Sequence, residues 1–242
     1  AGAIVVGPRL GKYTKDGTVR AIPGHNIPLA GLGVFILWFA WFGFNAGSTT
    51  TADGTIGYIA ANTSLAAGTG ALGAMIMAWL RFGKPDATMS LNGILAGLVG
   101  ITAGCYELAP LGAMVVGLGS GILCILSVEF IDKVLKVDDP VGCVSVHGTC
   151  GAFGTVCVGL FAAPGYGGLT GLFYGGGVDQ LGIQALGVAA VFVWAFGIGF
   201  VAFKIVDAIV GLRVDEDEER KGLDITEHGM ESYNGFQIFS TE

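Results

Sequence analysis

Six long apolar stretches follow one another along the chain, separated by short polar or glycine-rich segments. They cover residues 27–48, 57–80, 88–105, 110–131, 141–163 and 182–210. About 17–25 apolar residues suffice for a helix to cross a bilayer, so each stretch predicts a transmembrane helix. The stretches are continuously apolar rather than alternating, which favours helices over the strands of a membrane barrel. The third stretch is the shortest and carries Ser90 and Asn92.

The distribution of arginine and lysine agrees with six spans. Basic residues occur in segment 9–20, after the second stretch, after the fourth, and at or beyond the last. The three connections in between, near Asp53, at 106–109 and at 164–181, contain none. Because basic loops remain on the cytoplasmic side, this alternation predicts that both ends are cytoplasmic. It predicts a cytoplasmic loop at 9–26, a six-helix membrane domain at 27–210 and a cytoplasmic tail at 211–242.

The first eight residues lead directly into that basic loop. Their sequence, AGAIVVGP, is apolar and lacks the charged, apolar and small segments of a signal peptide. We expect residues 1–8 to be the end of a preceding transmembrane helix.

Composition places the chain among membrane proteins. Its mean hydropathy is +0.70, and 52% of its residues are hydrophobic while 13% are charged. Many of its 43 glycines predict close helix packing. Pairs one helical turn apart are Gly93/Gly97, Gly117/Gly121 and Gly171/Gly175. The net charge of −7 leaves no basic patch for nucleic acid, and five scattered cysteines do not describe a disulfide framework.

His147 is the one histidine inside an apolar stretch. An ionisable side chain at membrane depth costs roughly 2.5–3.5 kcal/mol, so it marks a pathway, relay or ligand site by default. Imidazole titrates near neutrality and both donates and accepts hydrogen bonds, which favours a pore or proton-relay histidine. Cys143 and Cys150 share its face of a regular helix, so a zinc or copper site is a second interpretation. A structural histidine bonded to a carbonyl is the third.

Aromatic residues cluster at the outer end of the first stretch. Trp41, Phe44 and Ser48 are three and four residues apart, which puts them on one helix face. Aromatic rings attract a cation by roughly 0.5–2 kcal/mol, and a serine oxygen accepts a hydrogen bond from an ammonium-type donor. An interfacial aromatic belt is the other interpretation of the same residues.

Asp139 and Pro140 stand at the start of the fifth stretch. Aspartate followed by proline is typical of a helix N-cap with proline at the first helical position. Asp139 is therefore predicted to cap the helix that carries His147, and a direct role for it in binding a proton or cation is the alternative.

Three motifs point together to one family. They are WFGFNAGS at 41–48, DDP with VHGTCG at 138–151, and VGLRVDEDEERKGLDITEHG at 210–229. With them the chain resembles the ammonium transporter (Amt/Mep/Rh) family along nearly its whole length, closest to microbial Amt proteins. The resemblance implies a trimer of eleven-helix subunits, each with two inverted five-helix repeats and a final long helix. This chain is similar to helices six to eleven.

The resemblance implies roles for residues at the matching positions. His147 matches the second of two pore histidines, Trp41 a pore-lining tryptophan, and Phe44 a phenylalanine that gates the outer mouth. Ser48 matches the serine of the external ammonium site, and Asp139 the acidic residue before the second pore histidine. The first pore histidine and most of the aromatic cage belong to the family's first repeat, so we expect them outside this chain.

The tail is similar to the family segment that couples neighbouring subunits and contacts PII-type signalling proteins. The matching positions are Gly211, Arg213, Gly222, Asp224 and His228. Met230 is a departure, because the family often has an acidic residue after the His-Gly pair.

The predicted function is ammonium transport across the plasma membrane, without catalysis and without a metal or other cofactor. Ammonium would bind at the outer vestibule, ammonia would cross an apolar pore, and the proton would pass along a histidine relay. Two alternatives are an ammonium sensor of the same fold and a membrane metal or redox protein that uses Cys143, His147 and Cys150. The chain contains no nucleophile-elbow or zinc-protease motif, which argues against a hydrolase.

Overall fold

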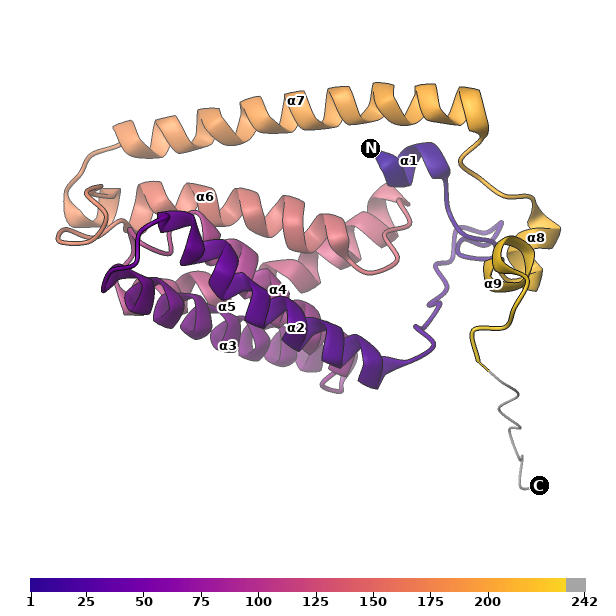
Figure 1. The fold of residues 1–242 in the computed structure, drawn as a ribbon, viewed down its shortest axis with the longest axis horizontal. Helices are drawn as coiled ribbons and strands as arrows, with labels where there is room; N and C mark the ends of the chain where they lie inside the picture. The colour runs from indigo at the N-terminus through magenta and orange to yellow at the C-terminus, as the bar shows by residue number, and fades with distance from the viewer. Residues whose placement is uncertain (234–242) are drawn as a thin grey trace.

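The computed structural model describes residues 1–233 as helices joined by turns and loops (Figure 1). The long helices are α2 (Ile27–Asn45), α3 (Thr55–Phe82), α4 (Ala87–Thr102), α5 (Pro110–Phe130), α6 (Cys150–Phe161) and α7 (Asp179–Val210). The short ones are α1 (Gly2–Val6), α8 (Glu216–Lys221) and α9 (Leu223–His228). Two 3₁₀ turns, η1 (Gly47–Thr49) and η4 (Leu172–Tyr174), and two π-helical segments, η2 (Ile131–Leu135) and η3 (Val144–Thr149), complete the helical structure described.

Each long helix coincides with one of the six apolar stretches, which confirms the all-α bundle of a polytopic membrane protein. Within residues 1–233, five helical segments are long and apolar enough to cross a membrane. The sixth, α4, has only 16 residues and ends at Thr102, after which the chain turns through residues 103–108. It lies at the centre of the bundle, where α2, α3, α5 and α6 all pack against it.

Local sequence sets the ends of several helices. The side-chain oxygen of Asn26 accepts a hydrogen bond from the backbone N–H of Leu29, and Asp86 accepts one from Met89. These two residues cap the free N–H groups at the starts of α2 and α4. α3 ends at Gly83, whose φ of 76° is a left-handed conformation that glycine adopts without strain.

Glycine allows the central helices to meet backbone to backbone. A Cβ atom at Gly97 in α4 would lie 2.1 Å from the carbonyl oxygen of Ala66 in α3. A Cβ atom at Gly121 in α5 would lie 2.1 Å from the carbonyl oxygen of Gly70 in α3. Such close approach supplies the van der Waals contact that holds helices together where the surrounding lipid is as apolar as the side chains.

The three glycine pairs predicted to allow close helix packing differ in whether they do so. Those in α4 (93 and 97) and α5 (117 and 121) contact α3 closely, as expected. The third pair, at 171 and 175, flanks η4 in the loop before α7. Gly171 packs against the backbone of Leu160 in α6, but the pair does not bring two helices together. A one-turn spacing therefore predicts helix–helix packing only where the segment is helical.

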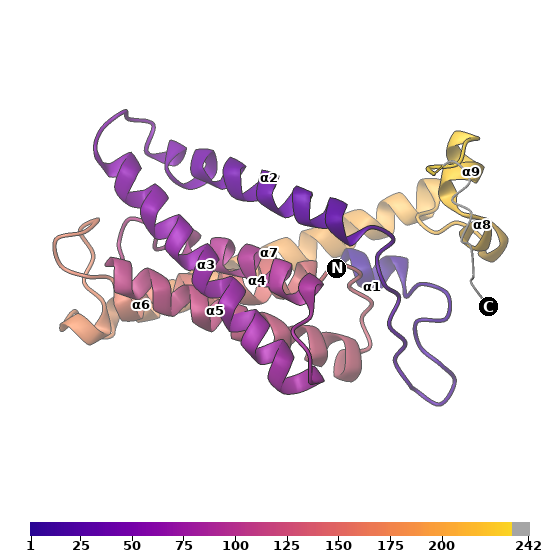
Figure 2. The same ribbon diagram turned by 90° about the horizontal axis from the view of Figure 1, so that it is seen from below.

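α7 lies along the outside of the bundle (Figures 1 and 2). It packs against α6 and α1, and none of its 32 residues is buried. The helix is apolar around its circumference over its central part, where the mean hydropathy of 18 residues is 2.3. Its outward faces therefore suit contact with lipid or with further protein.

Replacing Gly154 in α6 by alanine should push α6 away from α4. The added Cβ would lie 1.9 Å from the carbonyl oxygen of Gly100, and we expect a cost of about 1–3 kcal/mol. The matched control is Gly182→Ala in α7, where nothing lies within 4 Å of the new atom. Thermal unfolding in detergent should give a lower midpoint for Gly154→Ala and an unchanged one for the control; equal midpoints would contradict the prediction.

Candidate functional site

An open groove of about 420 Å³ lies where α2, α4, η3 and α6 meet. The lining residues are Trp41, Phe44, Val99, Thr102, Ala103, His147, Gly151 and Thr155. Three of the residues predicted from sequence, Trp41, Phe44 and His147, thus come together from helices about a hundred positions apart. The lining is mostly apolar, with the imidazole and two threonine hydroxyls as its principal polar groups.

Trp41 and Phe44 are held in fixed orientations at this groove. The indole Nε1 of Trp41 donates a hydrogen bond to the Thr102 hydroxyl at 3.0 Å, and that hydroxyl donates to the Leu98 carbonyl at 2.7 Å. The Phe44 ring meets the Trp41 ring edge to face, with centroids 5.7 Å apart. The two rings therefore form one aromatic surface whose direction α4 sets.

Ser48 is not part of that groove. α2 ends at Asn45, and Ser48 lies in the 3₁₀ turn η1, which continues the same helical segment to Thr49. Its hydroxyl donates to the carbonyl of Phe44 and is exposed. A face shared with Trp41 and Phe44 stays a prediction for Ser48, whose exposed side chain does not line the groove.

His147 lies in the π-helical segment η3 and its side chain is exposed toward the groove. In the part of the chain that the structure describes, no group forms a hydrogen bond with its imidazole. A structural histidine bonded to a neighbouring carbonyl is therefore not what this geometry shows. Both ring nitrogens are available to a ligand.

The two cysteines expected beside His147 do not form a metal site with it. Cys150 is buried and its thiol donates to the Ser120 carbonyl at 3.3 Å, while Cys143 is exposed. The π-helical turn also changes the spacing on which a shared face was predicted. Among residues 1–233, no group of three or more histidine, cysteine, aspartate or glutamate side chains could hold a metal ion.

Asp139 caps the segment that carries His147, as predicted, but the capped N–H groups lie four and five residues after it. Its two carboxylate oxygens accept the backbone N–H groups of Cys143 and Val144 at 2.9 and 2.7 Å. The helical segment begins at these residues because Pro140 and Val141 form a turn, so proline does not occupy its first position. The carboxylate at a helix start also interacts favourably with the helix dipole.

The preceding residue, Asp138, belongs to a second polar contact. Arg9 donates to its carboxylate from Nε and from a terminal guanidinium nitrogen, and also from its backbone N–H, each at 2.9 Å. The Asp138 side chain is only 2% exposed. Burial alone would raise the pKa of Asp138, but the hydrogen bonds and charge of Arg9 outweigh it and hold that pKa below its usual range.

The same N-terminal segment also contacts the tail. Glu219 accepts the backbone N–H of Leu10 at 2.8 Å and pairs with Arg213 at 2.6 Å. Arg213 in turn donates to the carbonyls of Val6 and Gly7. The hydrogen bond from Leu10 and the charge of Arg213 outweigh burial and lower the pKa of Glu219. The tail is thus fastened to residues 6–10 within one chain.

The other expected tail residues have local structural roles. Gly211 ends α7 at a φ of 72°, and Gly222 joins α8 to α9 at a φ of 102°. Asp224 accepts the backbone N–H of Ser232 at 2.9 Å, and its pKa is lowered by that bond above all. His228 is the last residue of α9 and is exposed. The part of the expected tail at 234–242 lies outside the described residues.

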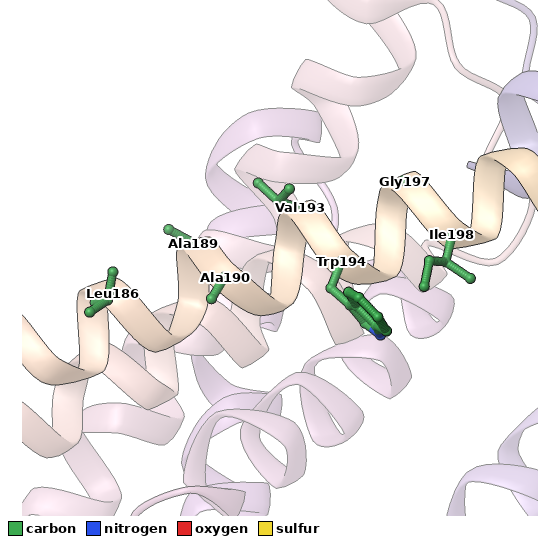
Figure 3. Close-up of a pocket in the computed structure, with 7 residues that line it drawn as sticks. All are labelled: Leu186, Ala189, Ala190, Val193, Trp194, Gly197 and Ile198. Atoms are coloured by element: carbon green, nitrogen blue, oxygen red, sulfur yellow. The ribbon is translucent and has the colours of Figure 1, made fainter.

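A larger depression, of about 510 Å³, is formed by α7 alone (Figure 3). Its lining residues are Leu186, Ala189, Ala190, Val193, Trp194, Gly197 and Ile198. None of them is ionisable, and the depression is part of the uncovered surface of α7. The groove beside His147 is therefore the better candidate site.

Several groups at the site were not predicted from the sequence. Thr102 orients Trp41, Arg9 neutralises Asp138, and Glu219 fastens the tail. Thr102 carries no sequence signal, because one threonine in an apolar helix is ordinary. Glu219 was visible only as one member of an acidic run.

Replacing Asp138 by asparagine should destabilise the protein at neutral pH by about 1–3 kcal/mol, because the guanidinium of Arg9 loses its charged acceptor. The pKa of Asp138 is lowered by folding, so its contribution is complete above the pKa of unfolded aspartate, about 3.9, and declines as pH falls further. Free energies of unfolding measured from pH 7 to pH 3 should show a difference, or gap, between wild type and variant that closes only at the acidic end. The exposed Asp217→Asn serves as control, and a gap that stays constant across this range would contradict the assignment.

The chain matches the model of the Ammonium Transporter Family over residues 1–233. It is 45% identical over 250 residues to the ammonium transporter Amt2 of Archaeoglobus fulgidus, covering 100% of this chain and 53% of that protein. It is 42% identical to the ammonium transporter of Mycobacterium tuberculosis strain H37Rv, covering 87% of this chain and 45% of that protein.

Two solved structures share the fold. One, described as a sensor Amt protein, has 44% sequence identity and a TM-score of 0.87 over 93% of this chain and 55% of its own. The other, Saccharomyces cerevisiae Mep2, has 30% identity and a TM-score of 0.78 over 89% and 50%. The chain spans about half the length of the relatives it matches. On the family match along 1–233 and these likenesses, the chain belongs to the ammonium transporter family.

Proposed function

We propose that this chain forms one wall of an ammonium-conducting pathway in a multi-pass plasma-membrane protein, with His147 in that wall. The observation that supports the proposal most is the groove itself, where an imidazole without a partner among residues 1–233 faces the same space as Trp41 and Phe44. The groove is open on one side, and the chain spans about half of its relatives. The facing wall, with a second histidine, would come from the remainder of the complete protein.

Recruitment of the cation would begin at the end of the groove near Phe44. The faces of Trp41 and Phe44 attract a cation by roughly 0.5–2 kcal/mol, and the exposed oxygen of Ser48 can accept a hydrogen bond from it. The connections at this end carry Asp53, Glu107 and Asp179 and no arginine or lysine. An acidic surface of this kind raises the local concentration of cations.

Passage through the groove favours the neutral amine. An ion at the centre of a bilayer is costly, whereas ammonia is neutral once its proton is removed. His147 can receive or pass on that proton because neutral imidazole carries both a donor and an acceptor. Potassium would be rejected, since it has no proton to release. This is transport without covalent chemistry, so no catalytic residue is assigned.

The tail is proposed as the regulatory part of the protein. Its contacts form a continuous path, because Glu219 holds Leu10, the adjacent Arg9 holds Asp138, and the next residue, Asp139, caps the segment with His147. A PII-type signalling protein that binds the tail on the cytoplasmic side would act on this path. Assembly as a homotrimer is proposed from the family resemblance, and the positive-inside pattern supports a cytoplasmic position for both ends of the chain.

An ammonium sensor is the second candidate function. It is favoured by one observation, the likeness to the solved structure described as a sensor Amt protein. Flux measurements in proteoliposomes separate the two functions, because a sensor binds ammonium without appreciable flux.

His147→Ala in the complete protein should reduce methylammonium uptake by about tenfold or more, because a positioned proton acceptor is lost. Discrimination against potassium should weaken in the same variant. Cys143→Ser, an exposed change on the same segment, is the matched control and should transport normally. Uptake and selectivity that remain intact in His147→Ala would refute the relay.

Glu219→Gln should release the tail from residues 6–10. Its charged acceptor is lost to both Leu10 and Arg213, and a loss of about 1.4 kcal/mol would make proteolysis of the tail about tenfold faster. Glu216→Gln is the control, because the Glu216 side chain is 73% exposed and its Arg220 contact is 3.6 Å long. Equal cleavage rates in the two variants would show that Glu219 does not hold the tail.

A further inference from the structure

The segment that carries His147 is wound more widely than the helix that follows it. The backbone N–H of Cys150 donates to the carbonyl of Ser145, five residues earlier, which is the π-helical pattern. The N–H of Val146 donates to the carbonyl of Gly142, four residues earlier, so the wide turn is local. Such single π turns are less stable than an α-helix and persist where other contacts hold them.

The start of this turn is held by the carboxylate of Asp139, as described above. Its end is held by a contact between two hydroxyls, Ser127 of α5 and Thr149, with their oxygens 2.8 Å apart. We name this contact the Ser127–Thr149 pair. Ser127 is 8% exposed, so a hydroxyl left without its partner there would not be satisfied by water.

Thr149 differs from other threonines in the bundle. Those that bond the carbonyl four residues before them in their own helix are Thr63, Thr69, Thr102 and Thr155. That is the usual bond of threonine inside a helix. For Thr149 the carbonyl in question is that of Ser145, and no bond from the Thr149 hydroxyl to it is found. Its hydroxyl instead crosses to α5.

The wide turn decides which side chains face the bundle. Ser145, Val146 and Cys150 are buried, and the latter two pack with Ala96 and Cys124. His147 is exposed on the groove side of the same turn. Since His147 lies three positions before Cys150, relaxation to an α-helical turn would rotate the His147 side chain by several tens of degrees about the helix axis relative to Cys150.

We infer that Thr149, through the Ser127–Thr149 pair, is the positioning residue that keeps η3 in its π-helical turn and so directs His147 into the groove. The inference rests on the proposed function for its effect on transport, but not for its structural part. Thr149 does not line the groove, so it acts through the histidine and not on the permeating molecule.

The test compares variants of the complete protein. Thr149→Val keeps the branched shape but removes the hydroxyl, and should lower methylammonium uptake by about tenfold, the scale on which partner groups that orient functional histidines act. Ser127→Ala should have a similar effect, and Thr149→Ser should restore uptake. Thr69→Val, which removes a hydroxyl bonded only within its own helix, is the matched control and should change uptake little.

A second comparison separates positioning from general damage. In a His147→Ala background, Thr149→Val should cause no further loss, because the two changes act through the same group. An equal loss in both backgrounds, or no recovery with Thr149→Ser, would overturn the inference.

The structural part is tested without transport. A crystal structure of Thr149→Val, or of Ser127→Ala if the first does not fold, should show the Cys150 N–H bonded to the carbonyl of Val146 in place of Ser145. A π turn and a His147 direction unchanged in that structure would overturn the inference, even if the wild-type protein proves not to transport ammonium.

Discussion

Direct backbone contact between helices, which glycine alone permits, is the constraint on which the rest of the structure depends. Gly97 and Gly121 bring α4 and α5 against the backbone of α3, and Gly154 brings α6 against Gly100 of α4. Gly100 is two residues from Thr102, and Gly154 is next to Thr155. The same contact therefore sets the width of the groove between Trp41 and His147. An added methyl group there would move the walls apart rather than merely loosen the core.

Two neighbouring aspartates connect this apolar bundle to its polar end. Asp138 is buried against Arg9, and Asp139 caps the segment that carries His147. Arg9 also lies beside Leu10, the residue that Glu219 holds. The tail and the segment with His147 are therefore joined by a continuous series of contacts through Glu219, Arg9 and Asp138. These polar contacts are strong because each carboxylate accepts more than one hydrogen bond.

Two surfaces of the described chain, on α7 and at the groove, are not covered by its other helices. α7 is apolar all round and has no buried residue, and the groove beside His147 is open. The chain spans about half the length of its relatives. A pathway that excludes water and ions needs a wall on every side, so in the function proposed above the open side of the groove would face another protein surface. The depression on α7 has no ionisable group, and the indole nitrogen of Trp194 is the one polar side-chain atom in its lining (Figure 3).

The positions of the six long helices and the family were predictable from the sequence, because hydropathy and three motifs are written along the chain. The sequence also identified His147, Trp41 and Phe44, which the structure brings to one groove. It did not predict the 3₁₀ turn that carries Ser48, since the end of an α-helix depends on the turn that follows. It did not predict the π-helical turn at 144–149 either, because periodicity assumes a regular helix. Contacts between distant residues, such as Trp41 with Thr102, Arg9 with Asp138 and Ser127 with Thr149, were decided by the tertiary structure alone, since only packing brings such groups within hydrogen-bond reach.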